Sequence, residues 1–459
     1  MSRSFRDPAG QVEDDGRRIL RVVHAAARAA TQELLDSDLY AGLIRDGFLI
    51  EARNVRPSAD GSLEIDHPRV DIPSYPFEWT PAMLADAALL TLDVQTRAWA
   101  AGWTLKDAPA NNVLFQGSRP VLCDLLSLQK RQPDDAPGWQ AYGQFVRHFV
   151  LPLLAIAQHG RTPRDIFLAH RDGLRAAEVA PFIPWHAHLG LAMWLHVRLP
   201  ARLERRRIAG NTAREHAPGK TPHNPRADGT PWLLSNLRGF IQRLARSSQA
   251  VSTWSAYTGN RDHYADAELQ AKRTAVQALV SARRPQRVLD IGANSGEFSL
   301  LAALAGAKVV ALDDDINALD QLHRHLRDNG SDIQCIHANF ARPTPATGWQ
   351  LTETQSLPTR LSGRFDLVLM LAVVHHLAVT ERLPLPQLFE TLADCCAGTL
   401  LLEFVPRDDP RFAEIAAANA SLYEGWSLQT LLDAARPWFE LREQTRISSH
   451  RTLLQLQRR

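Results

Sequence analysis

Cysteine is scarce in this sequence of 459 residues, which contains four: Cys123, Cys335, Cys395 and Cys396. None of them belongs to a C-x-x-C pair, and Cys335 lies inside a predicted buried strand. The pattern excludes a disulfide framework and a zinc site of the usual spacing, and it is typical of a reducing compartment. We therefore expect a cytoplasmic protein without a bound metal.

Long apolar segments are also missing. The first sixteen residues, MSRSFRDPAGQVEDDG, are polar and lack the apolar core of a signal peptide. The longest apolar runs, 149–157 and 189–199, are interrupted by Pro152 and His196, and both fall short of the roughly 20 residues that a membrane span needs. The sequence predicts no such span.

A large charge of one sign is absent as well, since the formal net charge is +2. The segment 202–246 is an exception, with ten Lys and Arg residues against three Asp and Glu. A contact with RNA or an anionic lipid surface is one interpretation of this segment. A solvated flexible connector over residues 209–230, which are rich in Pro, Gly, Asn and Thr, is the preferred one. Nucleic acid stays open as a partner without being indicated.

The most informative stretch covers residues 287–315, which are predicted to form a strand, a glycine turn, a helix and a second strand. Two glycines, Gly292 and Gly296, bracket the turn and permit positive φ and a close approach of the backbone to a ligand. The first strand carries Asp290, and the second ends at Asp313, 23 positions later. In a parallel β-α-β unit both strand ends meet at the edge of the sheet where ligands bind.

The positions of the two aspartates favour one ligand over others. A carboxylate at Asp313 can accept both hydroxyls of a ribose, and Asp290 can meet an ammonium directly or through water. S-adenosylmethionine carries both groups. A dinucleotide is the competing ligand, but its fingerprint requires G-x-G-x-x-G, and Asn294 stands at the second glycine position. A β-α-β unit that binds nothing is the third alternative.

Further apolar runs extend the predicted sheet. Residues 332–337, 365–371 and 400–405 are continuous apolar segments, as expected for parallel strands that are buried on both faces. The segments 438–447 and 451–457 follow as two β-like runs joined by a short turn. An antiparallel hairpin at the end of a parallel sheet is a feature of class I methyltransferases.

On these motifs the last two hundred or so residues resemble a class I S-adenosylmethionine-dependent methyltransferase. More narrowly, 348–353 (GWQLTE), 371–379 (LAVVHHLAV) and 401–409 (LLEFVPRDD) resemble bacterial methyltransferases that are related to nodulation proteins and carry a long N-terminal region. The resemblance implies a cofactor site for S-adenosyl-L-methionine made of Asp290, Gly292, Ala293, Asn294, Gly296, Asp313, Asp314, Asn339, Phe340 and Leu371. Asn339 stands where the family usually has an aspartate beside the adenine, and it keeps an acceptor oxygen.

Three residues are the candidates for catalysis: His375, His376 and Glu403. The histidines follow the fourth strand, where a base near neutral pKa suits an oxygen or nitrogen acceptor. Glu403 lies in the fifth strand and should face the cavity or a cation, because an unpaired buried carboxylate is costly. Packing or capping is the alternative role for the histidines. The helix predicted at 265–282 and the segment before it, through Tyr257, Tyr264 and Lys272, are expected near the methionine end.

The N-terminal half contains one motif with chemical content, at residues 105–126. Asp107 precedes Asn112 by five positions, and a predicted strand then leads to Asp124. Kinases use an Asp, an Asn and a second Asp in this order as base and Mg²⁺ ligands. However, no glycine-rich loop is evident and no lysine precedes Lys106. An unrelated loop, a kinase-like fold without phosphotransfer and an active phosphotransferase remain as alternatives.

The length allows two or three domains. We predict an N-terminal α+β domain over 1–160, with a degenerate kinase-like fold as one alternative, and a helical region with a basic linker over 161–250. A seven-stranded Rossmann-like methyltransferase domain is predicted over 251–459. The predicted function is methyl transfer to an unidentified acceptor, which could be a small molecule, a saccharide or a macromolecule. A binding or regulatory protein with a non-catalytic methyltransferase domain is the alternative.

Overall fold

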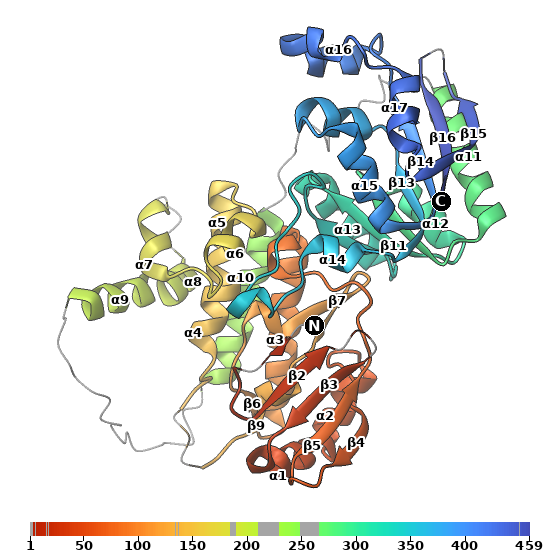
Figure 1. The fold of residues 1–459 in the computed structure, drawn as a ribbon. Coiled ribbons are helices and arrows are strands. Elements are labelled where there is room, and N and C mark those ends of the chain that lie inside the picture. Colours follow the sequence, from red (N-terminus) through yellow and green to blue (C-terminus); the bar gives the residue numbers. More distant parts are fainter. Residues whose placement is uncertain are drawn as a thin grey trace. The chain divides into compact units, whose positions relative to one another are not determined.

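The computed structural model describes residues 3–4, 6–14, 16, 18–133, 135, 137–183, 190–209, 229–247, 266–448 and 450–459. The chain divides into two compact units (Figure 1). The first unit comprises residues 1–116 and 120–250, and the second comprises residues 117–119 and 251–459. Most of the predicted connector at 209–230 lies outside the described residues. Tyr257 and Tyr264 also lie outside them.

The first unit begins with a five-stranded antiparallel sheet in the order β1-β2-β3-β5-β4. Its strands are β1 (Arg3–Ser4), β2 (Gly10–Asp14), β3 (Ile19–Val23), β4 (Arg53–Pro57) and β5 (Leu63–His67). Two helices, α1 (Ala25–Leu35) and α2 (Asp38–Arg45), connect β3 to β4. Inward positions of β5 alternate with partly exposed ones, so one face of the sheet supplies a core.

The helix α3 (Pro81–Ala100) is the central element of the first unit. Thr80 caps it by accepting a hydrogen bond from the Met83 amide, and Pro81 takes the first helical position, where no amide hydrogen is needed. Thirteen of its twenty residues are buried. The helix α10 (Thr230–Ser247) also packs against α3, which is therefore covered on more than one face.

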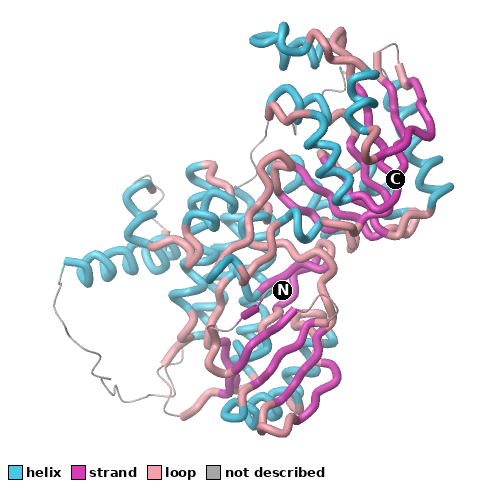
Figure 2. Tube along the Cα trace, viewed as in Figure 1, coloured by secondary structure: helices cyan, strands magenta, loops and turns pink. Residues whose placement is uncertain are grey.

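Short strands follow α3. They are β6 (Trp103–Leu105), β7 (Val113–Gln116), β8 (Arg119–Leu122) and β9 (Leu128–Lys130), of which β6 pairs with β9 and β7 with β8. Helices form the rest of the unit (Figure 2). They include α4 (Tyr142–Phe145), η4 (Val146–Val150), α5 (Leu151–His159), α6 (Pro163–Ala169), α7 (Ala176–Val179), η5 (Ala180–Phe182), α8 (Leu191–Met193), η7 (Trp194–Arg198) and α9 (Leu199–Ala209).

The second unit is built on a seven-stranded sheet in the order β12-β11-β10-β13-β14-β16-β15. Five strands are parallel: β10 (Arg287–Ile291), β11 (Lys308–Asp313), β12 (Gln334–His337), β13 (Phe365–Met370) and β14 (Cys396–Phe404). The last two, β15 (Phe439–Arg446) and β16 (Thr452–Arg458), form a hairpin that joins β14 in the antiparallel direction. The predicted seven-stranded Rossmann-like sheet and its terminal hairpin are confirmed.

Helices cover the sheet of the second unit. They are α11 (Asp266–Arg283), α12 (Glu297–Leu304), α13 (Ile316–Asp328), α14 (Leu357–Leu361), η11 (His376–Thr380), α15 (Leu385–Cys395), α16 (Pro410–Ala416), η12 (Ala417–Tyr423) and α17 (Leu428–Ala435), with a 3-10 turn η10 (Trp349–Leu351). Because the central strands are buried on both faces, their sequences are mostly apolar, with few polar residues such as Asp290 and Glu403. Among the described residues, every helix is too short or too polar to cross a membrane.

Candidate functional site

A cavity of about 670 Å³ opens at the carboxyl edge of the parallel strands in the second unit. This is the edge where ligands bind in open α/β sheets, and the volume falls within the range of small-molecule sites. Its wall includes eight of the ten predicted cofactor residues: Gly292, Ala293, Asn294, Asp313, Asp314, Asn339, Phe340 and Leu371. Asp290 and Gly296 lie outside the wall.

The glycine turn after β10 brings backbone into the cavity. Gly292 has φ +76°, and a Cβ atom there would lie 2.4 Å from a methyl carbon of Val373. Gly296 has φ +78° and begins α12, where a Cβ would meet Leu322 at 2.4 Å. Both positions therefore require glycine, Gly292 for the wall of the cavity and Gly296 for packing α12 against α13.

Asp313 ends β11 and lies in the cavity wall. Its Oδ2 accepts a hydrogen bond from the Asn294 amide and its Oδ1 accepts one from the Asp315 amide, both at 2.7 Å. Burial raises the pKa of this carboxyl to about 6, although the two amides act in the opposite direction. Each oxygen retains a second lone pair, so the carboxylate can accept further hydrogen bonds from a ligand.

Asp290 lies beneath the turn instead of in the wall. Its Oδ2 accepts a hydrogen bond of 2.7 Å from the hydroxyl of Ser299, which anchors the first turn of α12. Burial raises its pKa to about 6. In this geometry the carboxylate positions the turn, and a contact with a ligand through water stays a prediction.

Asn339, at the end of β12, is held differently from the sequence expectation. Its Oδ1 accepts hydrogen bonds from the amides of Ala341 and Arg342, and its Nδ2 donates to Asp314 at 2.8 Å and to Glu381 at 3.0 Å. The acceptor oxygen is therefore engaged by its own loop. The acceptor groups near Asn339 in the cavity wall are the carboxylates of Asp314 and Glu381. The sequence did not indicate Glu381, because the loop after β13 gives no sign that this residue lies close to Asn339.

Two residues other than glycine adopt left-handed backbone conformations in the cavity wall. Asn294 has φ +49° in the turn after β10, and Ala372 has φ +57° just after β13. Such conformations are uncommon outside glycine and often occur at functional sites. They shape the two neighbouring loops, after β10 and after β13, that contribute to the wall of the cavity.

His375 and His376 lie together after β13, with ring centroids 4.3 Å apart. His375 is 2% exposed, its ring stacks on Phe412, and its Nδ1 has no hydrogen-bond partner among the described residues. Burial is the main cause that holds the pKa of His375 well below 6.5, and the nearby charges of Arg451 and Lys272 act in the same direction. The pKa of His376 is lowered as well, again mainly by burial. Both line the cavity as uncharged bases at neutral pH.

Glu403 is fully buried in β14 and faces cations, as its sequence position predicted. Its Oε2 lies 2.5 Å from Lys272 Nζ and its Oε1 lies 3.3 Å from Arg451 Nη1. Arg451 also binds Asp409 at 2.8 Å. Lys272 and Arg451 line the cavity, whereas Glu403 stands behind them. This arrangement gives Glu403 contact with two cavity cations and no place in the cavity wall.

The first unit brings together the residues of the D-x-x-x-x-N motif. Asn112 Nδ2 donates to Asp107 at 3.3 Å and to the Ser127 hydroxyl at 2.8 Å, and Ser127 donates to Asp124 at 2.7 Å. Burial raises the pKa of Asp107. The three residues therefore form one polar cluster, as the kinase-like alternative requires.

Arg21 is a member of this cluster that the sequence did not indicate. It lies on β3, is 5% exposed, and its Nη1 is 2.8 Å from Asp124 Oδ1. Its Nη2 also donates to the carbonyl of Cys123. Local sequence gave no sign of this ion pair, because its two residues lie 103 positions apart.

The second unit, whose sheet ends in an antiparallel hairpin, also matches the model of a known protein family. Residues 261–455 match the model described as "Methyltransferase domain". Together the fold and this match define the second unit as a class I S-adenosylmethionine-dependent methyltransferase domain. S-adenosyl-L-methionine is the cofactor of this class, and the protein is an S-adenosylmethionine-dependent methyltransferase.

Several known proteins are similar to this chain. Nodulation protein NoeA of Rhizobium meliloti (strain 1021) is 29% identical over 441 residues, which cover 94% of this chain and 90% of NoeA. The N-methyltransferase NodS from Bradyrhizobium japonicum WM9 is 13% identical with a TM-score of 0.30, over 42% of this chain and 98% of NodS. Magnesium protoporphyrin IX methyltransferase (ChlM) from Synechocystis PCC 6803, with bound SAH, is 17% identical with a TM-score of 0.31, over 42% of this chain and 83% of ChlM. Of these similarities, the one to NoeA extends over most of both chains.

Proposed function

We propose that the cavity of the second unit holds S-adenosylmethionine with its ribose at Asp313. The two oxygens of this carboxylate each keep a free acceptor position toward the cavity, which matches the two vicinal hydroxyls of a ribose. The ring of Phe340 and the carboxylates of Asp314 and Glu381 then take the adenine side. The backbone of Gly292, Ala293 and Asn294 approaches the methionine portion.

The acceptor enters, in this proposal, beside the basic residues of the lining. These are Lys272, Arg411 and Arg451, and His375 and His376 line the same cavity. Methyl transfer is an in-line displacement, so the protein mainly aligns the acceptor atom with the sulfonium and removes a proton where the acceptor carries one. His375 is the base in this proposal, because it is uncharged and its Nδ1 lacks a protein partner among the described residues. The acceptor atom is oxygen or nitrogen.

The buried Glu403 acts indirectly in this scheme. Its charge balances Lys272 and Arg451 and fixes their positions beside the acceptor. It is therefore a positioning residue for two cations. The proposal rests chiefly on one observation: Asp313, whose carboxylate has free acceptor positions, and His375, whose Nδ1 has no hydrogen-bond partner among the described residues, both line one cavity.

The test uses methyl-labelled S-adenosylmethionine with the full chain and separated pools of small metabolites, saccharides, proteins and RNA. We expect label in one pool, and His375→Gln should reduce the initial rate by roughly 100-fold or more, as removal of a general base does. S-adenosylhomocysteine should still bind to this variant with unchanged affinity. Full turnover by His375→Gln would exclude the base, and failure of the folded wild type to bind S-adenosylhomocysteine would exclude the site.

For the first unit we propose a kinase-like module without phosphotransfer. Asp124 accepts hydrogen bonds from Arg21, from the Leu126 amide and from Ser127. Both of its oxygens are occupied by protein donors, and the arginine supplies the positive charge that a metal ion would bring. Titration with ATP and Mg²⁺ tests this proposal. Metal-dependent binding that disappears in Asp124→Ala would contradict it and favour an active phosphotransferase.

We further propose that the enzyme acts in the cytoplasm. All four cysteines are free thiols, and three of them are buried: Cys335, Cys395 and Cys396. Free thiols without a disulfide fit a reducing compartment. The division into a domain over 1–160, a helical region over 161–250 and a domain over 251–459 likewise stays a prediction, which limited proteolysis would test.

A further inference from the structure

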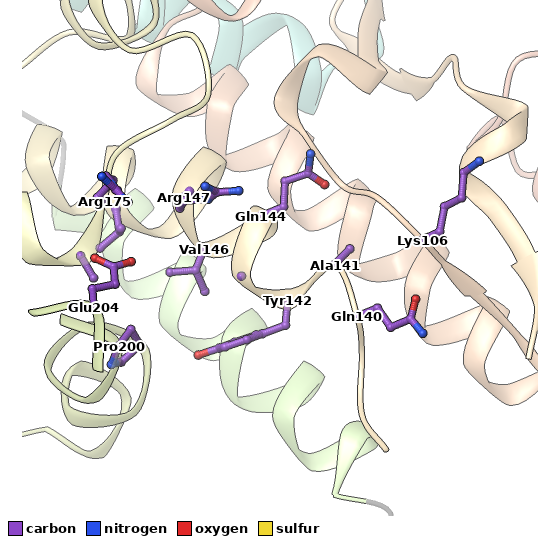
Figure 3. A pocket seen from close by; sticks show the side chains of 13 residues that line it. Lys106, Gln140, Ala141, Tyr142, Gln144, Val146, Arg147, Arg175, Pro200 and Glu204 are labelled. Atoms are coloured by element: carbon purple, nitrogen blue, oxygen red, sulfur yellow. The ribbon is translucent and has the colours of Figure 1, made fainter. Parts of the chain in front are cut away.

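A second cavity, of about 700 Å³, lies within the first unit and takes no part in the proposed methyl transfer. It is formed by residues from α4, η4, α5, α7 and α9, together with the residue after β6. Its charged lining residues are Lys106, Arg147, Arg175 and Glu204. Three positive groups against one negative group give the lining a balance of 3 − 1 = +2. Figure 3 shows Arg175, Arg147, Gln144 and Lys106 following one side of the pocket.

Two of these cations have no carboxylate partner. Among the described residues, Arg147 and Arg175 form no ion pair and no side-chain hydrogen bond, in contrast to Arg21, Arg69 and Arg451. Arg147 is partly buried and Arg175 is exposed. A guanidinium in such a place has its strongest complement in a carboxylate or phosphate group, which it can bind through two parallel hydrogen bonds.

The backbone fixes the two arginines next to each other. The Leu174 amide donates a hydrogen bond of 3.0 Å to the carbonyl of Arg147, and Arg175 is the next residue. Gly173 has φ +75°, and a Cβ atom there would lie 2.3 Å from the same carbonyl oxygen. Arg147 itself stands in η4, a π-helical turn of the kind that often occurs at functional sites. The fold therefore holds the backbones of the two arginines close together in the cavity lining.

The other polar groups of the lining include two donors, Gln144 and Lys106, and one carboxylate, Glu204. Gln144 uses its Oε1 to accept a hydrogen bond of 2.7 Å from the Ala108 amide, which leaves its Nε2 as a donor. The carboxylate of Glu204 is engaged through Oε2 by the Ala177 amide at 2.9 Å. Lys106 is held by Asp7 at 2.9 Å. The hydrogen bond from Ala108 also ties this wall to the loop that carries Asp107.

We propose that this cavity is a binding site for a small molecule that carries an oxyanion group, with Arg147 and Arg175 as its two anion-binding residues. The volume is several times that of a single phosphate, so the anion is one end of a larger ligand, and phosphate esters and carboxylates are the two possible sources of the oxyanion. The site is independent of the cofactor cavity, because its lining residues all belong to the first unit.

The test is calorimetric titration of the full chain with inorganic phosphate, pyrophosphate and citrate, in the presence of saturating S-adenosylhomocysteine. We expect saturable binding of at least one probe that weakens as salt rises, and a loss of at least tenfold in affinity in both Arg147→Gln and Arg175→Gln. A preference for pyrophosphate would assign a phosphate ester, and a preference for citrate a carboxylate.

The matched control is Arg28→Gln, which removes an exposed arginine of the same unit far from the cavity lining. It should bind each probe as the wild type does. All three variants should retain the thermal transition and the affinity for S-adenosylhomocysteine, which separates this site from the proposed methyl-transfer site. Absence of binding by the wild type, or equal weakening in Arg28→Gln, would overturn the proposal.

Discussion

At the scale of the residue, Asp313 shows how one side chain combines burial, backbone and ligand chemistry. Two amides hold its oxygens at 2.7 Å, yet burial raises its pKa to about 6. The unliganded site therefore keeps a carboxylate that a small fall in pH protonates. The cost of burying this charge is offset when ribose hydroxyls donate to it.

This pKa predicts the pH dependence of cofactor binding. Only the ionised carboxylate accepts both hydroxyls, so the affinity for S-adenosylhomocysteine should be constant above pH 7 and fall as the pH drops through about 6, by up to tenfold per pH unit. Calorimetry between pH 5 and 8 measures it. Asp313→Asn should flatten the dependence, apart from any contribution of Asp290, and an unchanged profile in this variant would assign the titration elsewhere.

Gly292 supports a second prediction at this scale. In Gly292→Ala the new methyl group would meet Val373 at 2.4 Å, and the residue would have to keep φ +76°. We expect a loss of cofactor affinity of roughly tenfold or more, together with a lower melting temperature, since a positive φ costs other residues about 1–2 kcal/mol. Gly363→Ala, which has a similar φ but no atom within 4 Å of the new methyl group, should lower stability without weakening binding.

At the scale of the element, buried charges join parts of the second unit that are distant in sequence. Lys272 lies on α11, Glu403 on β14 and Arg451 at the start of the last strand, and Asp409 caps α16. The network joins α11, β14 and the residue before β16, and its two cations Lys272 and Arg451 line the cavity. Such a network stabilises only when all its members are present.

Removal of one partner should therefore be costly. We expect Glu403→Gln to lower the free energy of unfolding by about 3–5 kcal/mol, because it leaves Lys272 and Arg451 facing each other without a counter-charge. Urea denaturation measures the change. The control Glu390→Gln, an exposed position on α15, should change stability by less than about 0.5 kcal/mol. If Glu403→Gln changed the free energy of unfolding as little as that control does, the network would not contribute to stability.

The elements that sequence predicted well are those with one dominant pattern. The parallel strands are mostly apolar segments, and the turn at Gly292 to Gly296 is constrained by backbone sterics, so both could be located from local sequence. The partners of Glu403 could not, because the sequence required a cation but gave no distance to Lys272 or Arg451. The same limit applies to Arg21 and to Glu381, whose roles depend on which loops meet in the fold.

At the scale of the whole molecule, the chain carries two compact units with separate polar centres. One contains the cofactor cavity, and the other contains the Asp107, Asn112 and Asp124 cluster together with the cavity at Arg147. We expect damage to one centre to leave the ligand affinity of the other unchanged, since each unit has its own core.

Arg21→Gln tests this independence. The change removes the charged donor from Asp124 and should cost the first unit about 1.5–3 kcal/mol, the usual value of a hydrogen bond to a charged group. The affinity for S-adenosylhomocysteine should stay within a factor of two of the wild type. Thermal denaturation and calorimetry give the two quantities, and a large loss of cofactor binding would show that the centres are coupled.

Calorimetric titration with S-adenosylhomocysteine tests most directly whether S-adenosylmethionine binds in the cavity at Asp313. We predict saturable one-to-one binding by the wild type and an affinity roughly 10- to 100-fold lower in Asp313→Asn, which loses charged hydrogen bonds worth about 1.5–3 kcal/mol. Asp328→Asn, an exposed position at the end of α13, should bind as the wild type does. Absence of binding by the folded wild type, or equal affinity of wild type and Asp313→Asn, would contradict the account.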